Sequence, residues 1–337
     1  MVAGFRLASF NLESLDEDGP GGLDLEARAD LLRPQLLRLR ADILCLQEVN
    51  AQPSAAGARS LRALDRLLEG TLYAAFHRAV TTNVKRIGPS DKHNLVVLSR
   101  WPLVGAHEYR HDLVPPCLYA PVTARGDAAA GAQPVHFERP VQHVEVALSD
   151  SDRLHVFNLH LRSRLASLIA GQKIGPFAWE SGAAWAEGAF LSAIKRSGQA
   201  LEARLAIERV FEYNPHALIA VIGDFNAEAD EVPVEILRAD TDNTGNPKLA
   251  GRVLAVLEPQ DGAATTVSMV HHGRAMRLDH MLVSRALLAW LATIEVHNEL
   301  LHDESIALAA RTAFPESYHA PIVASFTRPG LAGVDDR

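Results

Sequence analysis

The sequence is poor in cysteine. Its 337 residues include only Cys45 and Cys117. Two cysteines are too few for a disulfide framework or a cysteine-rich zinc site, so both classes are excluded. Cys45 stands in the apolar run Ile43–Leu46 and is expected to be a small buried side chain, whereas Cys117 follows two prolines in an expected loop.

Long hydrophobic runs are absent as well. No stretch reaches the roughly 18 apolar residues of a membrane-spanning helix, so stable membrane insertion is not expected. The first ten residues lack a basic segment followed by an apolar one, and they are expected to enter a strand almost at once. A cytoplasmic location follows as the default expectation.

Positive charge is scarce. Lys and Arg number 33 against 41 Asp and Glu, which gives a formal net charge of −8. This balance excludes a basic coat that binds nucleic acid by electrostatics alone. It does not exclude an enzyme that cleaves phosphate esters, because a divalent metal held by carboxylates supplies positive charge locally. With 48% hydrophobic residues, the chain can bury a sizeable core.

Short apolar runs alternate with helical patterns, which is typical of an α/β protein. Strands are expected over residues 5–10, 42–47, 94–99, 141–148, 154–159, 217–222, 276–283 and 322–326, and helices over 25–39, 61–68 and most of 163–211. Residues 109–140 are rich in Pro, Gly and Ala and are expected to leave the core, with a tip at 124–132. We expect one domain over residues 1–329 and a frayed tail over 330–337.

Six apolar runs end in side chains that can bind a metal or a phosphate. The residues at these ends are Asn11 and Glu13, Glu48, His160, Asp224 and Asn226, Asp279, and His319. Carboxylate and amide oxygens are the ligands preferred by hard cations such as Mg²⁺ and Mn²⁺. Histidines can hold a phosphate or move protons near neutral pH. Any one of these residues has an ordinary structural explanation, but their joint occurrence at strand ends indicates one shared site.

In their order along the chain, these motifs resemble those of the endonuclease/exonuclease/phosphatase superfamily, the DNase I-like proteins. The motif Gly223-Asp224-Phe225-Asn226 after a buried run is the most specific single element, and the resemblance extends from residue 5 to about 326. It implies a four-layer α/β sandwich of two packed mixed β-sheets flanked by helices. It also implies a divalent-metal-dependent phosphoesterase that uses direct attack of water.

The resemblance assigns a metal site to the first two motifs. Glu48 would be the principal ligand of Mg²⁺ or Mn²⁺, with Asn11 and Glu13 completing or supporting the shell. The family's last motif usually reads Ser-Asp-His, whereas this chain has Ser317-Tyr318-His319. A phenol is a poor ligand for Mg²⁺, so one metal and two metals both stay open.

The resemblance assigns the reaction itself to five residues. Asp224 would orient or deprotonate the attacking water, and Asn226 would hold a non-bridging phosphate oxygen. His319 would contact the phosphate or pass a proton while Asp279 fixes its tautomer. His160 would be a second histidine facing the phosphate.

Three further residues are candidates for substrate contact. Asn94 stands at the start of an expected strand, where it could face the site. The alternative interpretation is an ordinary turn residue. Arg139 can clamp a phosphate with two donors, although a surface ion pair is the simpler reading. Tyr318 offers a phenolic hydrogen bond.

The segment 162–190 directly follows His160 and carries four large aromatic side chains. Trp185 and Phe190 are expected to pack onto the core from a helix. For Phe177 and Trp179, core packing and a lid or membrane-touching surface that selects the substrate both stay open.

The expected function is a phosphodiesterase or nuclease-like hydrolase that binds nucleic acid transiently. Two alternatives stay open: a phosphoesterase for lipids or small molecules, resembling sphingomyelinases or inositol phosphatases, and a binding protein on the same fold that has lost catalysis. The sequence identifies no protein partner, oligomeric state or substrate.

Overall fold

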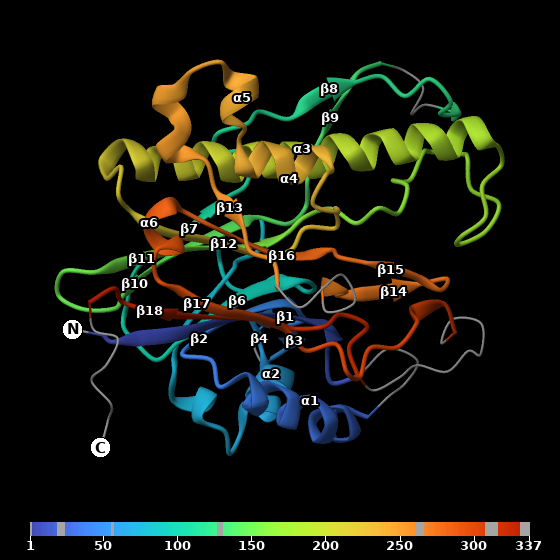
Figure 1. The fold of residues 1–337 in the computed structure, drawn as a ribbon. Coiled ribbons are helices and arrows are strands. Elements are labelled where there is room, and N and C mark those ends of the chain that lie inside the picture. Colours follow the sequence, from blue (N-terminus) through green and yellow to red (C-terminus); the bar gives the residue numbers. More distant parts are fainter. Residues whose placement is uncertain are drawn as a thin grey trace.

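Two six-stranded sheets form the centre of the molecule (Figure 1). The computed structural model describes residues 2–18, 24–54, 57–126, 131–259, 266–306 and 316–330. The first sheet has the order β17 (Leu291–Val296), β18 (Ile322–Thr327), β1 (Gly4–Leu15), β2 (Ile43–Val49), β6 (Asn94–Ser99) and β5 (His77–Val80). The second has the order β13 (Ala255–Val256), β16 (Asp279–Val283), β12 (Leu218–Asp224), β11 (Arg153–His160), β10 (Val141–Ala147) and β7 (Leu103–Tyr109).

Both sheets are mixed. Each contains one parallel pair, β1 with β2 and β11 with β12, and its other neighbours run antiparallel. A parallel pair places the carboxyl ends of both strands at the same edge of a sheet, which is where α/β proteins commonly bind ligands. In each sheet, the parallel pair therefore marks the edge at which a ligand site is expected.

Helices cover the outer faces of the sheets. Figure 1 shows α1 (Leu25–Leu39) and α2 (Arg62–Leu68) beyond the first sheet, and α3 (Gly182–Tyr213) with α4 (Val232–Arg238) beyond the second. Buried side chains form one cluster between the sheets and one under each helical layer. The expected four-layer α/β sandwich is confirmed.

Short elements complete the chain. They are the hairpins β3 (Gln52–Pro53) with β4 (Arg59–Ser60), β8 (Cys117–Tyr119) with β9 (Gln133–Val135) and β14 (Met269–His271) with β15 (Arg274–Met276), and the single turns η3 (Leu72–Ala75), α5 (Thr241–Thr244), η5 (Pro247–Arg252) and α6 (Arg285–Leu288). The excursion of residues 109–140 contains the β8–β9 hairpin; residues 127–130 of its tip and 331–337 of the expected tail lie outside the described residues.

The prediction for residues 163–211 is a largely helical segment whose opening is interrupted by Gly and Pro at 171–176. The interruption is present, but the helix begins only after it, so the helical part expected before residue 171 is wrong. Helix α3 starts at Gly182, where the Ser181 hydroxyl accepts a hydrogen bond from the Ala184 backbone N–H. Gly171 has a φ of 71°, a left-handed conformation that a helix does not allow, and Pro176 lacks a backbone donor. Among the described residues, no helix is both long and apolar enough to cross a membrane.

A buried polar network joins the sheets. Asn158 on β11 donates to the Leu46 and Val96 carbonyl oxygens of the first sheet, at 3.2 and 3.3 Å. Its own Oδ1 accepts a 2.7 Å hydrogen bond from Gln47 Nε2 on β2. Because buried amides are costly unless paired, this network fixes how the two sheets stack.

Candidate active site

The strand ends that the sequence singled out meet at one edge of the sandwich. In the parallel registers Asn11 pairs with Gln47 and His160 with Asp224, while antiparallel β16 places Asp279 opposite Asp224. This catalytic edge comprises Asn11, Glu13, Glu48, His160, Asp224, Asn226, Asp279 and His319. In Figure 1 it lies at the carboxyl end of β1, away from the N-terminus.

Backbone strain is concentrated at this edge. Glu13, Ser14, Glu48, His93 and Asn226 all have left-handed φ values, between 49° and 58°. Such a conformation costs a non-glycine residue about 1–3 kcal/mol and persists only where surrounding contacts enforce it. At Glu48 it interrupts the regular pairing of β2 with both of its neighbours.

The motif Gly223-Asp224-Phe225-Asn226 has a packing reason for its glycine. Gly223 has a φ of 137°, and a Cβ there would lie 2.0 Å from the Leu159 carbonyl oxygen. Only glycine therefore lets β12 approach β11 this closely. Phe225 is fully buried beneath the site, so Asp224 and Asn226 on either side of it are held by the core.

Asp224 is the most constrained carboxylate. Its Oδ1 accepts from the Asn226 backbone N–H at 2.8 Å, and its Oδ2 accepts from Asn226 Nδ2 at 3.0 Å and Asn11 Nδ2 at 3.2 Å. Burial nevertheless raises its pKa to about 7, against the opposing charge of His319. An oriented carboxylate that titrates near neutral pH is suited to general base catalysis.

His319 is the charged histidine. Its Nδ1 lies 2.8 Å from Asp279 Oδ2, and its Nε2 lies 3.9 Å from Asp224 Oδ2. Burial alone would lower its pKa, but these two carboxylates raise the pKa of His319 well above its ordinary value. The side chain is therefore an imidazolium at neutral pH, with Asp279 fixing the orientation of its ring.

His160 is the neutral histidine. It is buried, and its Nε2 lies 3.3 Å from Asp224 Oδ2 and 3.5 Å from Glu48 Oε1. Burial lowers the pKa of His160 well below its ordinary value, and Arg139 and His93 add to that effect. The edge thus holds two histidines in opposite charge states.

Glu48 and Glu13 share the other half of the site. Glu48 Oε2 accepts from the Ser14 backbone N–H at 2.9 Å and the Ser14 hydroxyl at 3.0 Å. Burial raises the pKa of Glu13 to about 8, and the negative charge of Glu48 adds to it. A cation between the two carboxylates would relieve this repulsion, and the oxygen donors fit a hard divalent ion. The residues present therefore fit the implied metal.

A small basic cavity adjoins the carboxylates. Its volume is about 250 Å³, and its cationic lining side chains are Lys92, Arg139 and Arg162, together with His93. Arg139 Nη1 donates to the Leu161 carbonyl oxygen at 3.0 Å, which anchors the guanidinium beside the site. This lining supplies the positive charge that a phosphate needs, although the chain as a whole is acidic.

The three substrate candidates have different surroundings. Arg139 is charged and lies beside Glu48 and Asp224. Asn94 is buried, and its amide donates to the Val49 and Ser90 carbonyl oxygens while its Oδ1 accepts from the Ser90 backbone N–H. This bonding makes Asn94 a residue that holds the preceding loop. Tyr318 is buried next to His319.

Asn226 uses its side-chain amide within the protein. Both amide hydrogens are used, one toward Asp224 Oδ2 and the other toward the Leu161 carbonyl oxygen at 3.1 Å. In this structure the side chain therefore holds Asp224 in place instead of presenting donors to a phosphate oxygen.

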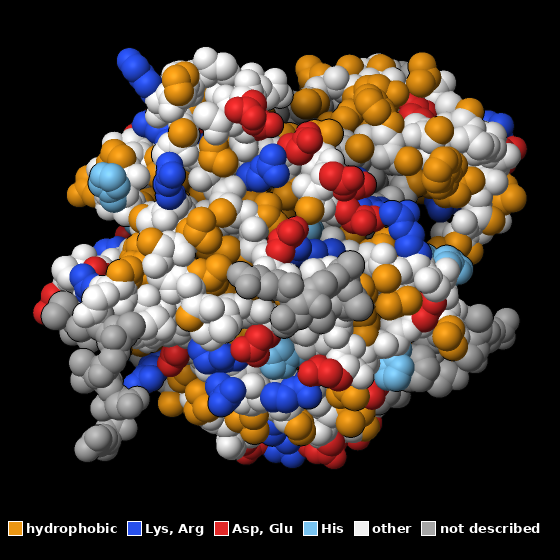
Figure 2. Space-filling model, in the orientation of Figure 1, with side chains coloured by type: hydrophobic (Ala, Val, Ile, Leu, Met, Phe, Trp, Pro, Cys, Tyr) orange, Lys and Arg blue, Asp and Glu red, His pale blue; other side chains and the backbone are white. Residues whose placement is uncertain are grey.

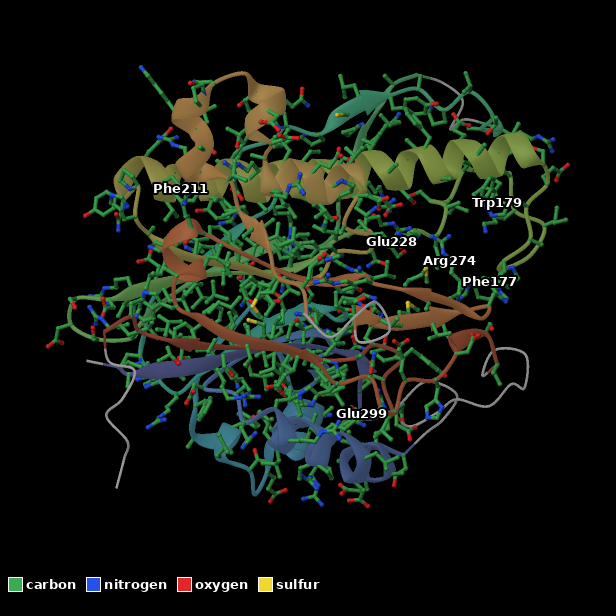
Figure 3. The ribbon with its side chains drawn as sticks, viewed as in Figure 1. Phe177, Trp179, Phe211, Glu228, Arg274 and Glu299 are labelled. Carbon is green, nitrogen blue, oxygen red and sulfur yellow. The ribbon has the colours of Figure 1, made fainter. Side chains whose placement is uncertain are left out.

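The aromatic segment 162–190 borders the same edge. Arg164 Nε donates to the Asn226 carbonyl oxygen at 3.2 Å, which ties the segment to the catalytic loop. Figure 3 shows Phe177 and Trp179 on the loop that precedes α3. Phe177 is 86% exposed, and Trp185 and Phe190 are about half exposed, so the expected core packing of the last two is wrong.

Sequence reasoning missed two residues that shape the site, Ser14 and Arg28. His93, which directly precedes the candidate Asn94, lies 3.7 Å from Glu48 Oε2. Ser14 binds Glu48, and buried Arg28 donates to the Leu12 carbonyl oxygen at 2.8 Å, behind Glu13. No spacing in the sequence reveals these two residues. Ser14 acts on Glu48, which is distant in the chain, and Arg28 reaches from helix α1 to the carbonyl oxygen of Leu12.

A family comparison agrees with this geometry. Residues 8–297 match the model of the endonuclease/exonuclease/phosphatase family. The chain belongs to this family. Its members hydrolyse phosphoric esters with a divalent metal, and the chain is an enzyme of that class. No curated protein matches the sequence.

Solved structures of the family share the fold at low identity. Truncated TDP2 from Caenorhabditis elegans is 15% identical with a TM-score of 0.55, covering 96% of this chain and 98% of that one. Humanised D. rerio TDP2 is 14% identical with a TM-score of 0.56, covering 97% and 100%. The 3′ phosphatase NExo from Neisseria, solved with a product DNA hairpin, is 16% identical with a TM-score of 0.53, covering 96% and 100%.

Proposed function

We propose that this chain is a Mg²⁺- or Mn²⁺-dependent phosphodiesterase that hydrolyses its substrate by in-line attack of water, without a covalent intermediate. The observation that carries the proposal is the buried pair of Asp224 and His319. Asp224 has a pKa of about 7 and His319 is held charged, so a base and a cation face the same space.

The metal would be held by oxygen atoms of Glu48 and Glu13, with Asn11 supporting them. When bound, it neutralises charge on the phosphoryl group and polarises the phosphoryl oxygen. Asn11 donates to Asp224 and accepts from the Glu13 backbone N–H at 2.9 Å, so it couples the metal side of the site to the base.

The chain's own residues would perform the proton transfer. Asp224, fixed by Asn226 and Asn11, accepts the proton of the attacking water at Oδ1, because both lone pairs of Oδ2 already accept from the Asn226 and Asn11 amides. His319 directs its charged Nε2–H to the phosphoryl oxygens, where negative charge grows in the transition state. Asp279 keeps that ring oriented, and neutral His160 offers a further donor beside Asp224.

We favour a nucleic-acid phosphoester as the substrate class. The similar NExo structure holds a product DNA hairpin, and the basic cavity at Arg139 and Arg162 offers positive charge for a phosphate next to the scissile one. With a net charge of −8, binding is expected to be transient and to depend on the metal.

A lipid phosphodiester is the second candidate, and one observation favours it. Figure 2 shows hydrophobic side chains gathered over the first half of α3 and the loop before it. The exposed members of this apolar patch are Leu165, Leu168, Ile174, Phe177, Trp185 and Phe190. Exposed aromatic and aliphatic side chains next to a phosphoesterase site can contact a membrane surface.

The test is hydrolysis of bis-p-nitrophenyl phosphate, followed by DNA, RNA, sphingomyelin vesicles and inositol phosphates, with Mg²⁺ or Mn²⁺. Glu48→Gln and His319→Gln should remove activity, and the exposed His77→Gln should not. Full activity of either site variant, or in excess EDTA, would refute the proposal. Loss of vesicle hydrolysis alone in Phe177→Ala would select the lipid candidate.

Ligand binding without any turnover would favour the third reading, a binding protein that has lost catalysis. Restored activity in Tyr318→Asp would then locate the cause. One domain over residues 1–329 and a cytoplasmic location stay predictions.

A further inference from the structure

A second cluster of histidine and carboxylate side chains lies on the outer face of the second sheet. His143 and Glu145 on β10 and His155 on β11 each offer one ligand atom, and these atoms lie within 4.8 Å of one another. His155 precedes His160 by five residues on the same strand, so the outer cluster lies about 17 Å from the catalytic edge. The proposed phosphoesterase reaction does not use it.

The strand registers bring these side chains to one face. Glu145 pairs with His155 across β10 and β11, and His143 pairs with His107 on β7. Because alternate residues of a strand share a face, His143 and Glu145 point the same way. They line a cavity of about 690 Å³ under the C-terminal part of α3, together with His107.

The nitrogen atoms are spaced for a shared ion. His143 Nε2 lies 3.0 Å from His155 Nδ1. Two imidazole nitrogens bound to one tetrahedral zinc ion are about 3.3 Å apart, so a small ring movement converts the present contact into coordination. The His143 ring is held by stacking on Phe157, with centroids 4.2 Å apart.

Two observations describe the surroundings of the ligand atoms. His143 is 4% exposed, and the nitrogen that would bind the ion, Nε2, faces His155, while Nδ1 on the other side of the ring has no hydrogen-bond partner among the described residues. Within the same part of the chain, the Glu145 carboxylate has no hydrogen bond or salt bridge, and a Cβ on Gly105 would lie 3.1 Å from its Oε1, so that glycine makes room for it.

The protonation state also suits a metal ligand. Burial lowers the pKa of His143 to about 3, and His155 and His107 add to this effect. Burial likewise lowers the pKa of His155. Both rings are neutral at pH 7, and a neutral imidazole offers a lone pair to a metal without first releasing a proton.

We infer that His143, Glu145 and His155 bind a zinc-class divalent ion, with the remaining coordination position facing the cavity. Two imidazoles and one carboxylate are a common zinc ligand set. Glu48, His93 and His160 at the catalytic edge offer a similar set, so only variants of the outer cluster tell the two sites apart.

The experiment counts bound ions in the full-length protein after chelator treatment. Zn²⁺ is titrated against a chromophoric chelator, and Co²⁺ is added to parallel samples for its visible spectrum. Wild type is compared with Glu145→Gln, His155→Gln and the exposed His216→Gln, which lines the same cavity. Ions at the catalytic edge contribute equally to each comparison.

Glu145→Gln and His155→Gln should each bind one Zn²⁺ fewer than wild type, or bind it at least tenfold more weakly. Replacing even a residue that only hydrogen-bonds to a metal ligand typically weakens metal binding by that factor. His216→Gln should bind as wild type does. The wild-type minus Glu145→Gln difference in the Co²⁺ samples should show visible bands. Equal stoichiometry and affinity in all four proteins would overturn the inference. If His155→Gln fails to fold, the nearly isosteric Glu145→Gln still tests the site.

Discussion

Both clusters combine histidines with carboxylates, but His319 at the catalytic edge is charged, whereas His143 in the outer cluster is neutral. At the catalytic edge, carboxylates outnumber histidines: burial and then Glu48 raise the pKa of Glu13, and Asp279 and Asp224 keep His319 charged. In the outer cluster, histidines outnumber carboxylates: burial lowers the pKa of His143, whose ring stacks on Phe157, to about 3, and His155 and His107 add to this effect. The comparison shows that the ratio of partners and the burial around a group set its charge.

The largest expected effect comes from removing the base. Asp224→Asn should lower kcat by about 10²–10⁴-fold, because an amide cannot take a proton and its NH2 group cannot accept the hydrogen bonds that the replaced oxygen receives from Asn226 or Asn11. Steady-state hydrolysis at saturating Mg²⁺ measures it, with His77→Gln as the control. A loss of less than tenfold would show that Asp224 is not the base.

A smaller loss is expected when the charged histidine loses its support. Asp279→Asn should lower kcat about 10–10²-fold through misplacement of the ring. Asp279 raises the pKa of His319, so the variant should also move the alkaline limb of the pH–rate profile to lower pH. An unchanged limb, measured as kcat/KM against pH, would show that His319 does not act as a cation.

The carboxylates predict an alkaline loss of stability. Without metal, the free energy of unfolding should fall as pH rises from about 4.5 to 8, because the folded pKa values of Glu13 and Asp224 lie above their ordinary ones. Groups with a raised pKa stabilise the fold below the ordinary pKa and lose that contribution as pH rises through the folded one.

Urea unfolding at several pH values checks this slope. Glu13→Gln and added Mg²⁺ should each flatten it, whereas the exposed Glu235→Gln should leave it as in wild type. The same slope in Glu13→Gln as in wild type would show that Glu13 is not raised.

The outer cluster predicts the smallest effect, with the opposite sign. The pKa of His143 is lowered from 6.5 to about 3, so unfolding takes up a proton and stability falls as pH drops below 6.5. His143→Phe should remove part of this acid loss, measured as Tm between about pH 6.5 and pH 4. His160 contributes a similar loss, so the slope should decrease without vanishing. If the Tm of His143→Phe falls with decreasing pH as steeply as that of wild type, His143 is not neutral in the folded protein.

Much of the catalytic edge was predictable because its members follow strands. The ends of apolar runs are visible in sequence. Parallel pairing then places His160 beside Asp224, and the packing of the two sheets brings Glu48 to them. The outer cluster was not predictable: His143, Glu145 and His155 lie inside strands, where alternate polar residues look like an ordinary solvent-facing side. Only their register and the cover of α3 make them neighbours.

The sequence by itself determined the alternation of strands and helices, the polar strand ends and the glycine of the Gly223-Asp224-Phe225-Asn226 motif, because these depend on local pattern and backbone space. The tertiary structure decided the charges. Burial and distant partners set the pKa values of Asp224 and His319, and the full use of the Asn226 amide and the exposure of Trp185 follow from contacts across the chain. Those contacts join residues tens or hundreds of positions apart, and a local pattern carries no information about such distances.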